Sequence, residues 1–344
     1  MALAAQEPRY AVQSRLVIVP VTVTDAKGRI VDDLEPKDFI VLDNGRPQRA
    51  TVDSATTGVA PIALVVAVQA SGISKPVLEK LPKVAAMFQP LVAGDGGCTA
   101  VASFGDRITW LHECTGDEGA VTRSFELIRP EAPKRARMLD AVQQSIDRLR
   151  KFPNSRRVLL LISESRDRGS DATLQQVAIA AQNHGVTVYA ATYSAFASAF
   201  TTKSSAIGDP HPAKIPKTPS EQTGTLDGDS PHCNPAGCPE PPVPLADQRV
   251  DLLGAFGELL RLGKTNTTQA LAEGTGGATF PFTRQKGLEE TIQKLSGELH
   301  SQYVLSFMPA DRAPGYHRLE IQIDRRDLRI RARPGYWSAM GGDQ

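Results

Sequence analysis

Residues 61–74 read PIALVVAVQASGIS, an uninterrupted apolar run followed by a polar turn that contains glycine. A strand that is apolar at every position is buried on both faces, as in a parallel sheet covered by helices. The same apolar pattern recurs in RVLLLIS (157–163) and in VTVYAATYS (186–194), and segments with helical periodicity separate these runs. Because strands alternate with helices, the sequence predicts an α/β fold with a doubly wound, mostly parallel sheet.

Helical periodicity fills the intervals between the strands and continues after them. The predicted helices cover 75–92, 138–152, 173–185, 250–263, 267–277 and 288–300. Pro82 interrupts the first of them, because a proline inside a helix removes a backbone donor. Strand-period patterns occupy both ends of the chain instead, at 15–25, 38–50, 303–309, 317–324 and 328–337. Asn44-Gly45 within the second of these predicts a tight hairpin.

Neither terminal group has enough strands to be stable alone. We therefore expect residues 12–57 and 301–337 to form one small β-sandwich, with a 61–298 α/β domain inserted between them. Within that domain, residues 201–246 hold ten of the 25 prolines and few large apolar side chains. This composition predicts a disordered insertion over 195–246, rising from the carboxyl edge of the sheet, that binds a partner, covers a site or is inert.

The four cysteines form two local pairs. Cys98 and Cys114 flank two apolar runs that predict a hairpin, and Cys233 and Cys238 close a short loop. Disulfides at both places would put the chain in an oxidising compartment, periplasmic or secreted, whereas four free thiols would suit the cytosol. A zinc site built from His232, Cys233 and Cys238 lacks a fourth ligand.

Charge and hydropathy limit the classes of partner that the chain is expected to bind. The 39 basic and 38 acidic residues nearly cancel, so no global field attracts nucleic acid or an anionic membrane. The basic runs at 134–137 and 324–333 are expected to be solvated surfaces. No apolar run approaches the roughly 18 residues of a membrane span. The start, MALAAQEPRY, has a small-residue pattern typical of a cleavage site without the preceding apolar stretch, which fits a truncated export signal or an ordinary terminus.

Three stretches give the chain a resemblance to a known family: residues 15–48, LAEGTGGATF (271–280), and 298–324 together with ARPGYW (332–337). In these stretches it resembles the exported bacterial proteins called VWFA-related, common in acidobacteria, which contain a von Willebrand factor type A domain. The resemblance implies a sheet with one antiparallel edge strand, here 107–113. It also implies a protein-binding role and a metal-ion-dependent adhesion site at the carboxyl ends of the strands.

That metal site uses an Asp-x-Ser-x-Ser turn, a threonine and a second aspartate. On this chain the resemblance places those ligands at Gln69, Ser71, Ile73, Ala136 and Glu164. Only Ser71 is retained, and Glu164 is an acid longer by one methylene. The amide of Gln69 lacks the negative charge that would offset the cation's charge, and Ile73 and Ala136 supply no oxygen at all. The remaining hydroxyl and acid compete poorly with the hydration water of Mg²⁺, which this ion gives up reluctantly. We therefore expect a degenerate site without metal or cofactor.

A second set of ligands could rescue the site. A register shift in the turn would bring Ser71 and Ser74 together with Asp140, Glu164 and Asp167 as alternative metal ligands. Otherwise Glu164 and Asp167 are expected to be solvated carboxylates that pair with Arg166 or Arg168.

The sequence thus favours an exported, non-enzymatic module that binds an unidentified protein partner, with its oligomeric state open. Metal-dependent adhesion through the shifted ligands is one alternative, and an uncharacterised hydrolase is another. Ser71 lacks the G-x-S-x-G context of a nucleophile, and the glycines of 271–280 follow a helix rather than a strand, the reverse of a phosphate loop. None of the six histidines stands in a catalytic pattern, and each, including His317, is expected at the surface or at the end of an element.

Overall fold

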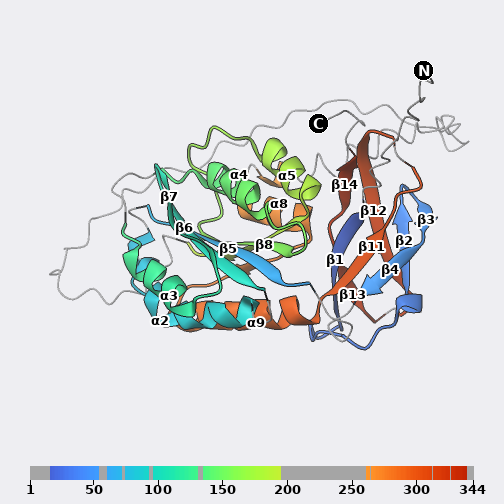
Figure 1. The fold of residues 1–344 in the computed structure, drawn as a ribbon, viewed down its shortest axis with the longest axis horizontal. Helices are drawn as coiled ribbons and strands as arrows, with labels where there is room; N and C mark the ends of the chain where they lie inside the picture. The colour runs from blue at the N-terminus through green and yellow to red at the C-terminus, as the bar shows by residue number, and fades with distance from the viewer. Residues whose placement is uncertain are drawn as a thin grey trace, which may run out of the picture.

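The computed structural model describes residues 16–53, 60–71, 74–92, 96–130, 135–194, 261–263, 265–311, 313–325 and 327–338. They form one six-stranded sheet covered by helices and two four-stranded sheets beside it (Figure 1). The insertion predicted at 195–246, the thiols of Cys233 and Cys238, His232 and Ile73 lie outside the described residues. Within the described part of the chain, no helix is both long and apolar enough to cross a membrane.

The six-stranded sheet has the order β10-β9-β8-β5-β6-β7. Its strands are β5 (Ile62–Gln69), β6 (Cys98–Phe104), β7 (Ile108–Thr115), β8 (Arg156–Ser163), β9 (Val186–Thr192) and β10 (Thr279–Pro281). All neighbours are parallel except β7, which runs antiparallel to β6 at one edge. Every residue of β5 is buried. The predicted fold class is confirmed, and so is the antiparallel edge strand that was expected at 107–113.

Helices cover both faces of this sheet, because successive side chains of a strand point to opposite sides. One group contains α1 (Lys75–Leu78), α2 (Leu81–Val84), the 3₁₀ segment η3 (Ala85–Val92), α3 (Glu118–Leu127) and α9 (Gln285–Ser301). The other contains α4 (Met138–Leu149), α5 (Leu174–Asn183) and α8 (Thr267–Thr275). Leu64 and Val66 of β5 belong to the core under the first group, and Val65 and Ala67 to the core under the second.

One helical prediction needs correction, and one helix was missed. The helix expected over 75–92 is divided into α1, α2 and η3, because Pro76 and Pro82 each begin a short helix and Pro90 lies inside the third segment. Helix α3 was not predicted from the sequence. Its start is nevertheless encoded locally, since the Asp117 side chain accepts hydrogen bonds from the backbone N–H groups of Gly119 and Ala120.

The two chain ends together build the four-stranded sheets. Their orders are β13-β1-β11-β4 and β14-β12-β2-β3. The strands are β1 (Val17–Thr24), β2 (Phe39–Asp43), β3 (Arg46–Gln48), β4 (Ala50–Asp53), β11 (Tyr303–Phe307), β12 (Gly315–Ile323), β13 (Arg329–Arg331) and β14 (Gly335–Ser338), and the 3₁₀ turn η1 (Pro36–Asp38) precedes β2. Asn44 and Gly45 both have positive φ, as the predicted hairpin requires.

A single apolar core joins these two sheets. It contains Val19 and Val21 of β1, Leu305 of β11, Val41 of β2 and Leu319 of β12. Strand β1 pairs with β11 over Val17–Val21, so segments almost the whole chain apart lie side by side. The sheets agree with a β unit made from both termini, and the domain limits 12–57 with 301–337 and 61–298 stay a prediction.

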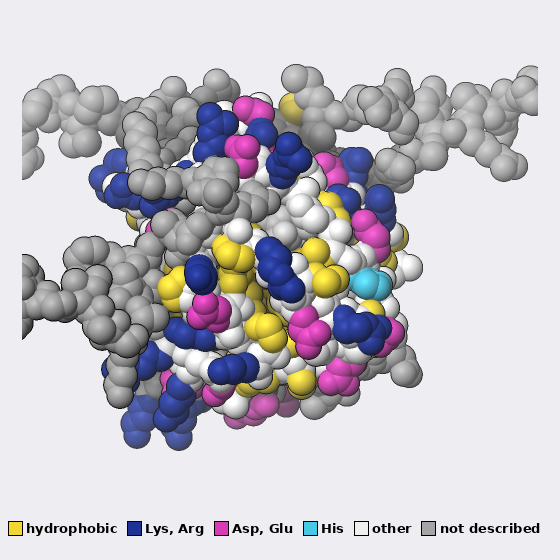
Figure 2. Space-filling model, turned by 90° about the vertical axis from the view of Figure 1, so that its left-hand side faces the viewer, with side chains coloured by type: hydrophobic (Ala, Val, Ile, Leu, Met, Phe, Trp, Pro, Cys, Tyr) yellow, Lys and Arg dark blue, Asp and Glu magenta, His cyan; other side chains and the backbone are white. Residues whose placement is uncertain are grey.

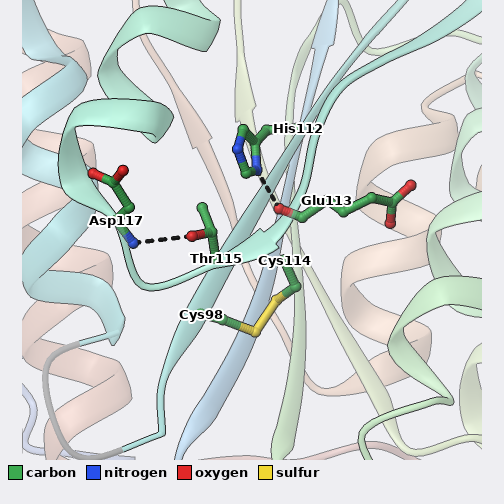
Figure 3. The surroundings of a disulfide bond; sticks show 6 residues. All are labelled: Cys98, His112, Glu113, Cys114, Thr115 and Asp117. Carbon is green, nitrogen blue, oxygen red and sulfur yellow. Dashed lines mark hydrogen bonds between the residues drawn. A yellow bond between two sulfur atoms is a disulfide. The ribbon is translucent and has the colours of Figure 1, made fainter.

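The edge strand β7 is also linked covalently to the sheet (Figure 3). Cys98 at the start of β6 and Cys114 near the end of β7 form a disulfide with a Cα–Cα distance of 5.2 Å. This bond confirms the first predicted pair. His112 precedes it in β7 and points its Nδ1 to the Glu113 carbonyl oxygen at 2.6 Å, on an exposed part of the strand.

Arginines of the C-terminal segment join the β unit to the α/β unit. The expectation that residues 324–333 form a solvated face is wrong for Arg331 and Arg333. Arg331 pairs with the buried Glu298 of α9 at 2.5 Å and donates to the Gly276 carbonyl oxygen at 3.1 Å. Arg333 is only 7% exposed and donates to the Gln182 carbonyl oxygen at 3.0 Å. Strand periodicity showed that these arginines lie on one face of the strand, but it could not show that the α/β unit packs against that face.

Candidate functional site

The candidate site lies at the carboxyl ends of β5 and β8, the edge where open α/β sheets place their ligands. Gln69 is the last residue of β5, and Glu164 directly follows β8. Ser71 lies in the turn after β5, and Ser74 is the residue before α1. These four side chains come from two neighbouring strands, because β5 pairs with β8 in the sheet.

The amide of Gln69 occupies the centre of this group. Its Oε1 accepts a hydrogen bond from the backbone N–H of Glu164 at 2.9 Å, and since an N–H can only donate, this contact fixes the orientation of the amide. The Nε2 therefore points the other way. It donates to Ser71 Oγ at 2.9 Å and to Glu164 Oε2 at 3.3 Å. Gln69 is fully buried.

The network continues through two serines to a tyrosine. The hydroxyl groups of Ser71 and Ser74 lie 3.2 Å apart and share a hydrogen bond. Tyr193, just beyond β9, donates its phenol to Ser74 Oγ at 2.7 Å. Burial raises the pKa of Tyr193, so this phenol stays neutral and remains a donor. Tyr193 was not anticipated from the sequence, where it looked like the end of an apolar strand.

Glu164 is held from the other side by a guanidinium. Arg168 Nη2 lies 3.2 Å from Glu164 Oε2 and 3.4 Å from Oε1. The prediction of a solvated carboxylate is wrong for Glu164, which is 8% exposed, but its pairing with Arg168 is confirmed. Arg166 instead donates its Nε to the Thr265 carbonyl oxygen at 3.1 Å.

The remaining predicted positions separate into a second network. Ala136 is fully buried, and its backbone pairs with that of Arg168. Asp167 accepts from the Leu139 backbone N–H at 3.0 Å at the start of α4. Asp140 accepts from Arg137 Nε at 2.7 Å and from the Ala172 N–H at 2.8 Å. Of the shifted ligands, the structure thus brings Ser71, Ser74 and Glu164 together, while Asp140 and Asp167 hold the 167–172 loop against α4.

This donor set fits a divalent cation poorly. Mg²⁺ needs oxygen acceptors that converge on one point, and here the Nε2 of Gln69 directs its two hydrogens to the oxygens of Ser71 and Glu164. The buried polar side-chain atoms of Gln69, Ser71 and Ser74 all have hydrogen-bond partners. Among the residues that the structure describes, no group of three or more His, Cys, Asp or Glu side chains could hold a metal ion.

The catalytic alternatives can be compared with the same geometry. Ser71 Oγ has an amide and another hydroxyl as neighbours rather than a base. The expectation that His317 lies at the surface is wrong, because it is 2% exposed inside β12. Its Nδ1 faces Asp43 Oδ1 at 3.1 Å and its Nε2 faces the Ala313 carbonyl oxygen at 2.8 Å. The His317–Asp43 pair lies in the terminal sheets, and the His317 ring stacks on that of Tyr336.

The surface around the carboxyl edge carries charges of both signs. The carboxyl ends of the parallel strands lie on the left in Figure 1, and Figure 2 turns this side toward the viewer. Hydrophobic side chains gather near the middle of the visible face, with Lys, Arg, Asp and Glu side chains around them (Figure 2). In the loops beyond β6 and before α4, Arg135 pairs with Asp106 at 3.5 Å.

Comparisons with known proteins give structural similarity alone. No family model and no curated protein matches the chain. It is similar to an aerotolerance-related membrane protein from Bacteroides fragilis, with 13% identity, a TM-score of 0.40, and 70% of this chain and 99% of that chain covered. The conserved hypothetical protein BatB from Bacteroides thetaiotaomicron gives 15% identity, a TM-score of 0.40, and coverage of 70% and 100%.

A third similar structure is proximal thread matrix protein 1 from the mussel byssus, with a zinc-occupied MIDAS motif. It shares 10% identity with this chain, with a TM-score of 0.44 and coverage of 75% of this chain and 50% of that one. None of these values is high enough to transfer a ligand or an activity to the present chain.

Proposed function

We propose that this chain is an exported, non-enzymatic protein-interaction module of the VWFA-related type, and that it works without a metal ion. The observation that carries the proposal is the buried Gln69 amide. It stands where the type A domain would have its first metal-binding aspartate, and it donates to the same kinds of oxygen that a cation would attract. An amide nitrogen with two hydrogens thereby replaces the ion's role of holding Ser71 and Glu164 together.

Charge balance supports the same reading. Glu164 is the one carboxylate in the hydrogen-bonded group of Gln69, Ser71, Ser74 and Glu164, and the guanidinium of Arg168 already offsets its charge. A cation entering this group would have to displace the amide and compete with an arginine. Hydrolysis is disfavoured for a related reason, because among the described residues no base is in hydrogen-bond contact with Ser71 to remove its proton.

Two further features support the exported and protein-binding parts of the proposal. The Cys98–Cys114 disulfide is of the kind that persists in oxidising compartments such as the periplasm or the extracellular space. The face in Figure 2 has apolar side chains surrounded by charged ones, which is the anatomy of many protein interfaces. The 195–246 insertion, by its place in the sequence after β9, is our candidate for an arm or a cover at this edge.

The metal question can be decided by calorimetry and thermal unfolding. We expect no binding heat and no rise in melting temperature with millimolar Mg²⁺ or Mn²⁺. The alternative of metal-dependent adhesion has one observation in its favour, the meeting of Ser71, Ser74 and Glu164. It would be established by a metal-induced stabilisation that Ser71→Ala and Glu164→Ala abolish and that Asp171→Ala, an exposed carboxylate outside the cluster, leaves intact.

The partner question needs affinity capture from cell-envelope extracts. The intact chain should retain the same proteins with Mg²⁺ and with a chelator, and a variant without residues 201–246 should lose them if the insertion is the binding arm. Unchanged capture by the shortened variant would make the insertion inert or a cover. A hydrolase screen serves as the counter-test, since turnover that Ser71→Ala removes would replace the interaction proposal with an enzymatic one.

A further inference from the structure

A cleft of about 450 Å³ lies at the opposite end of the six-stranded sheet from Gln69. One wall is the outward face of β1 and β11, with Leu16, Ile18 and Val304. The other wall is the segment 153–158, which leads into β8, together with the start of β9. The cleft therefore lies where the β unit meets the α/β unit, a position that small-molecule sites often occupy.

The wall formed by β1 is apolar on the side where a sheet is normally polar. Alternate residues of this strand, such as Val17 and Val19, are buried in the core between the two terminal sheets. Leu16 and Ile18 point the other way and are 53% and 45% exposed. A sheet face that is open to water usually carries polar side chains, so two large apolar groups side by side in a cleft are the kind of surface that a ligand covers.

Two arginines supply the charge of the cleft. Arg156 Nε and Nη1 donate to the carbonyl oxygens of Ala60 at 3.2 Å and Leu299 at 2.6 Å. Arg157 Nε donates to the Phe152 carbonyl oxygen at 3.0 Å, and its Nη1 donates to the carbonyl oxygen of His184. These bonds hold the two guanidinium groups near the C-terminal ends of helices, and among the described residues neither Nη2 has a hydrogen-bond partner.

Neither arginine has a carboxylate within ion-pair distance in the described part of the chain. Burial lowers the pKa of Arg156 to about 10 and also lowers that of Arg157, so both remain charged near neutral pH although they are partly desolvated. Asp53 also lines the cleft, but it is exposed, and the two cations outnumber it. A bound anion would supply the opposite charge that the described residues do not place within ion-pair distance of Arg156 and Arg157.

We propose that this cleft binds a small amphiphilic carboxylate, whose aliphatic tail lies along Leu16 and Ile18 and whose carboxylate meets one guanidinium of the opposite wall, because Arg156 and Arg157 extend to opposite faces of the sheet. A guanidinium fork matches a carboxylate in shape and charge. The volume suits a small ligand, since such pockets typically measure roughly 300–1,000 Å³. The site is independent of the interaction proposed for the other end of the sheet.

Titration calorimetry with octanoate tests the proposal. Acetate and 1-octanol separate the contribution of the carboxylate to the affinity from that of the aliphatic tail. Octanoate is expected to bind at one saturable site. Acetate lacks the tail and should bind more than a hundredfold more weakly, because each buried methylene contributes about 0.8 kcal/mol. Octanol lacks the charge and should bind at least about tenfold more weakly, because hydrogen bonds to charged groups are the stronger ones.

Two matched variants test whether octanoate binds in this cleft. Ile18→Thr should weaken octanoate binding by roughly three- to tenfold through lost apolar contact. Ile40→Thr changes an isoleucine of β2 with nearly the same exposure, 46%, which does not line the cleft, so it should bind octanoate like the unchanged chain. Both are exposed strand positions where threonine is well tolerated.

Three outcomes would overturn the proposal. The first is the absence of saturable octanoate binding. The second is equal binding of octanol, which would make the arginines simple helix caps and the cleft a neutral apolar site. The third is a concentration-dependent dimer that Ile18→Thr abolishes, which would assign the cleft to a second copy of the chain.

Discussion

The substitution Gln69→Glu changes one NH₂ group into an oxygen and tests whether the amide nitrogen takes the place of a cation. In the native chain Nε2 lies 3.3 Å from Glu164 Oε2 and donates to it. In the variant two carboxylates would face each other across that distance. Their repulsion, if both were charged, would be about 5 kcal/mol at an effective dielectric constant of 20.

The pair can avoid that repulsion by keeping one proton. Holding a carboxyl with an ordinary pKa of about 4.3 protonated at about pH 7.5 costs about 4 kcal/mol, at 1.36 kcal/mol per pKa unit. This is the cheaper route, so it sets the expected loss. Because the folded pKa of the pair is raised above the unfolded value, the variant keeps its stability below about pH 4.3 and loses it progressively as the pH rises.

Urea unfolding followed by circular dichroism measures this effect. The difference in unfolding free energy between the native chain and Gln69→Glu should be a few tenths of a kcal/mol at about pH 4 and about 4 kcal/mol at about pH 7.5. Gln176→Glu is the control, since Gln176 is exposed at the start of α5 and glutamate suits its capping position. Millimolar Mg²⁺ should stabilise Gln69→Glu at neutral pH and leave the native chain unchanged.

One result would refute the reasoning about Gln69. If Gln69→Glu loses the same stability at both pH values, its side chain does not sit against Glu164, and the network at the end of β5 is wrong. If Mg²⁺ stabilised the native chain as much as the variant, the proposal that the Gln69 amide takes the place of a cation would be refuted.

Three other perturbations test the rest of the fold. The double substitution Cys98→Ser and Cys114→Ser should lower the unfolding free energy by about 3 kcal/mol in urea unfolding, as expected for a loop of this length; an unchanged value would mean that β7 is held without the bond. Glu298→Gln should cost about 3 kcal/mol in thermal unfolding because Arg331 loses its buried partner, whereas the exposed Glu290→Gln should cost almost nothing. Gly276→Ala should be more destabilising than Gly28→Ala in the same assay, because both have positive φ but only at Gly276 would a Cβ meet the backbone N of Arg333, at 2.7 Å; equal effects would contradict the close approach of the C-terminal segment to α8.

Much of the fold could be predicted because its elements are encoded locally. Burial of β5 on both faces appears in the sequence as an apolar residue at nearly every position, and the Asn44-Gly45 turn appears as two residues that tolerate positive φ. The capping box of Thr173 and Gln176 marks the start of α5 in the same way. The divided segment 75–92 shows the limit, since helical periodicity there outweighed the prolines in the prediction but not in the structure.

Only the location of the candidate site could be predicted from the sequence. The order of elements placed Gln69, Ser71 and Glu164 at one edge of the sheet, because the carboxyl ends of neighbouring parallel strands meet there. What the side chains do at that edge was not predictable. The sequence shows only an uncharged polar residue at the end of an apolar strand, and the structure adds that the amide nitrogen of Gln69 bridges two oxygens.

By itself, the sequence determined the class of the fold, the position of its hairpins and the residues at the ligand edge, because each depends on a pattern among neighbours in the chain. The tertiary structure decided the partners. It paired β1 with β11, packed Arg331 and Arg333 against the α/β unit, and set His317 beside Asp43. The physical reason is that periodicity reports which face of an element is buried, whereas charge and hydrogen-bond partners are chosen by whatever that face meets.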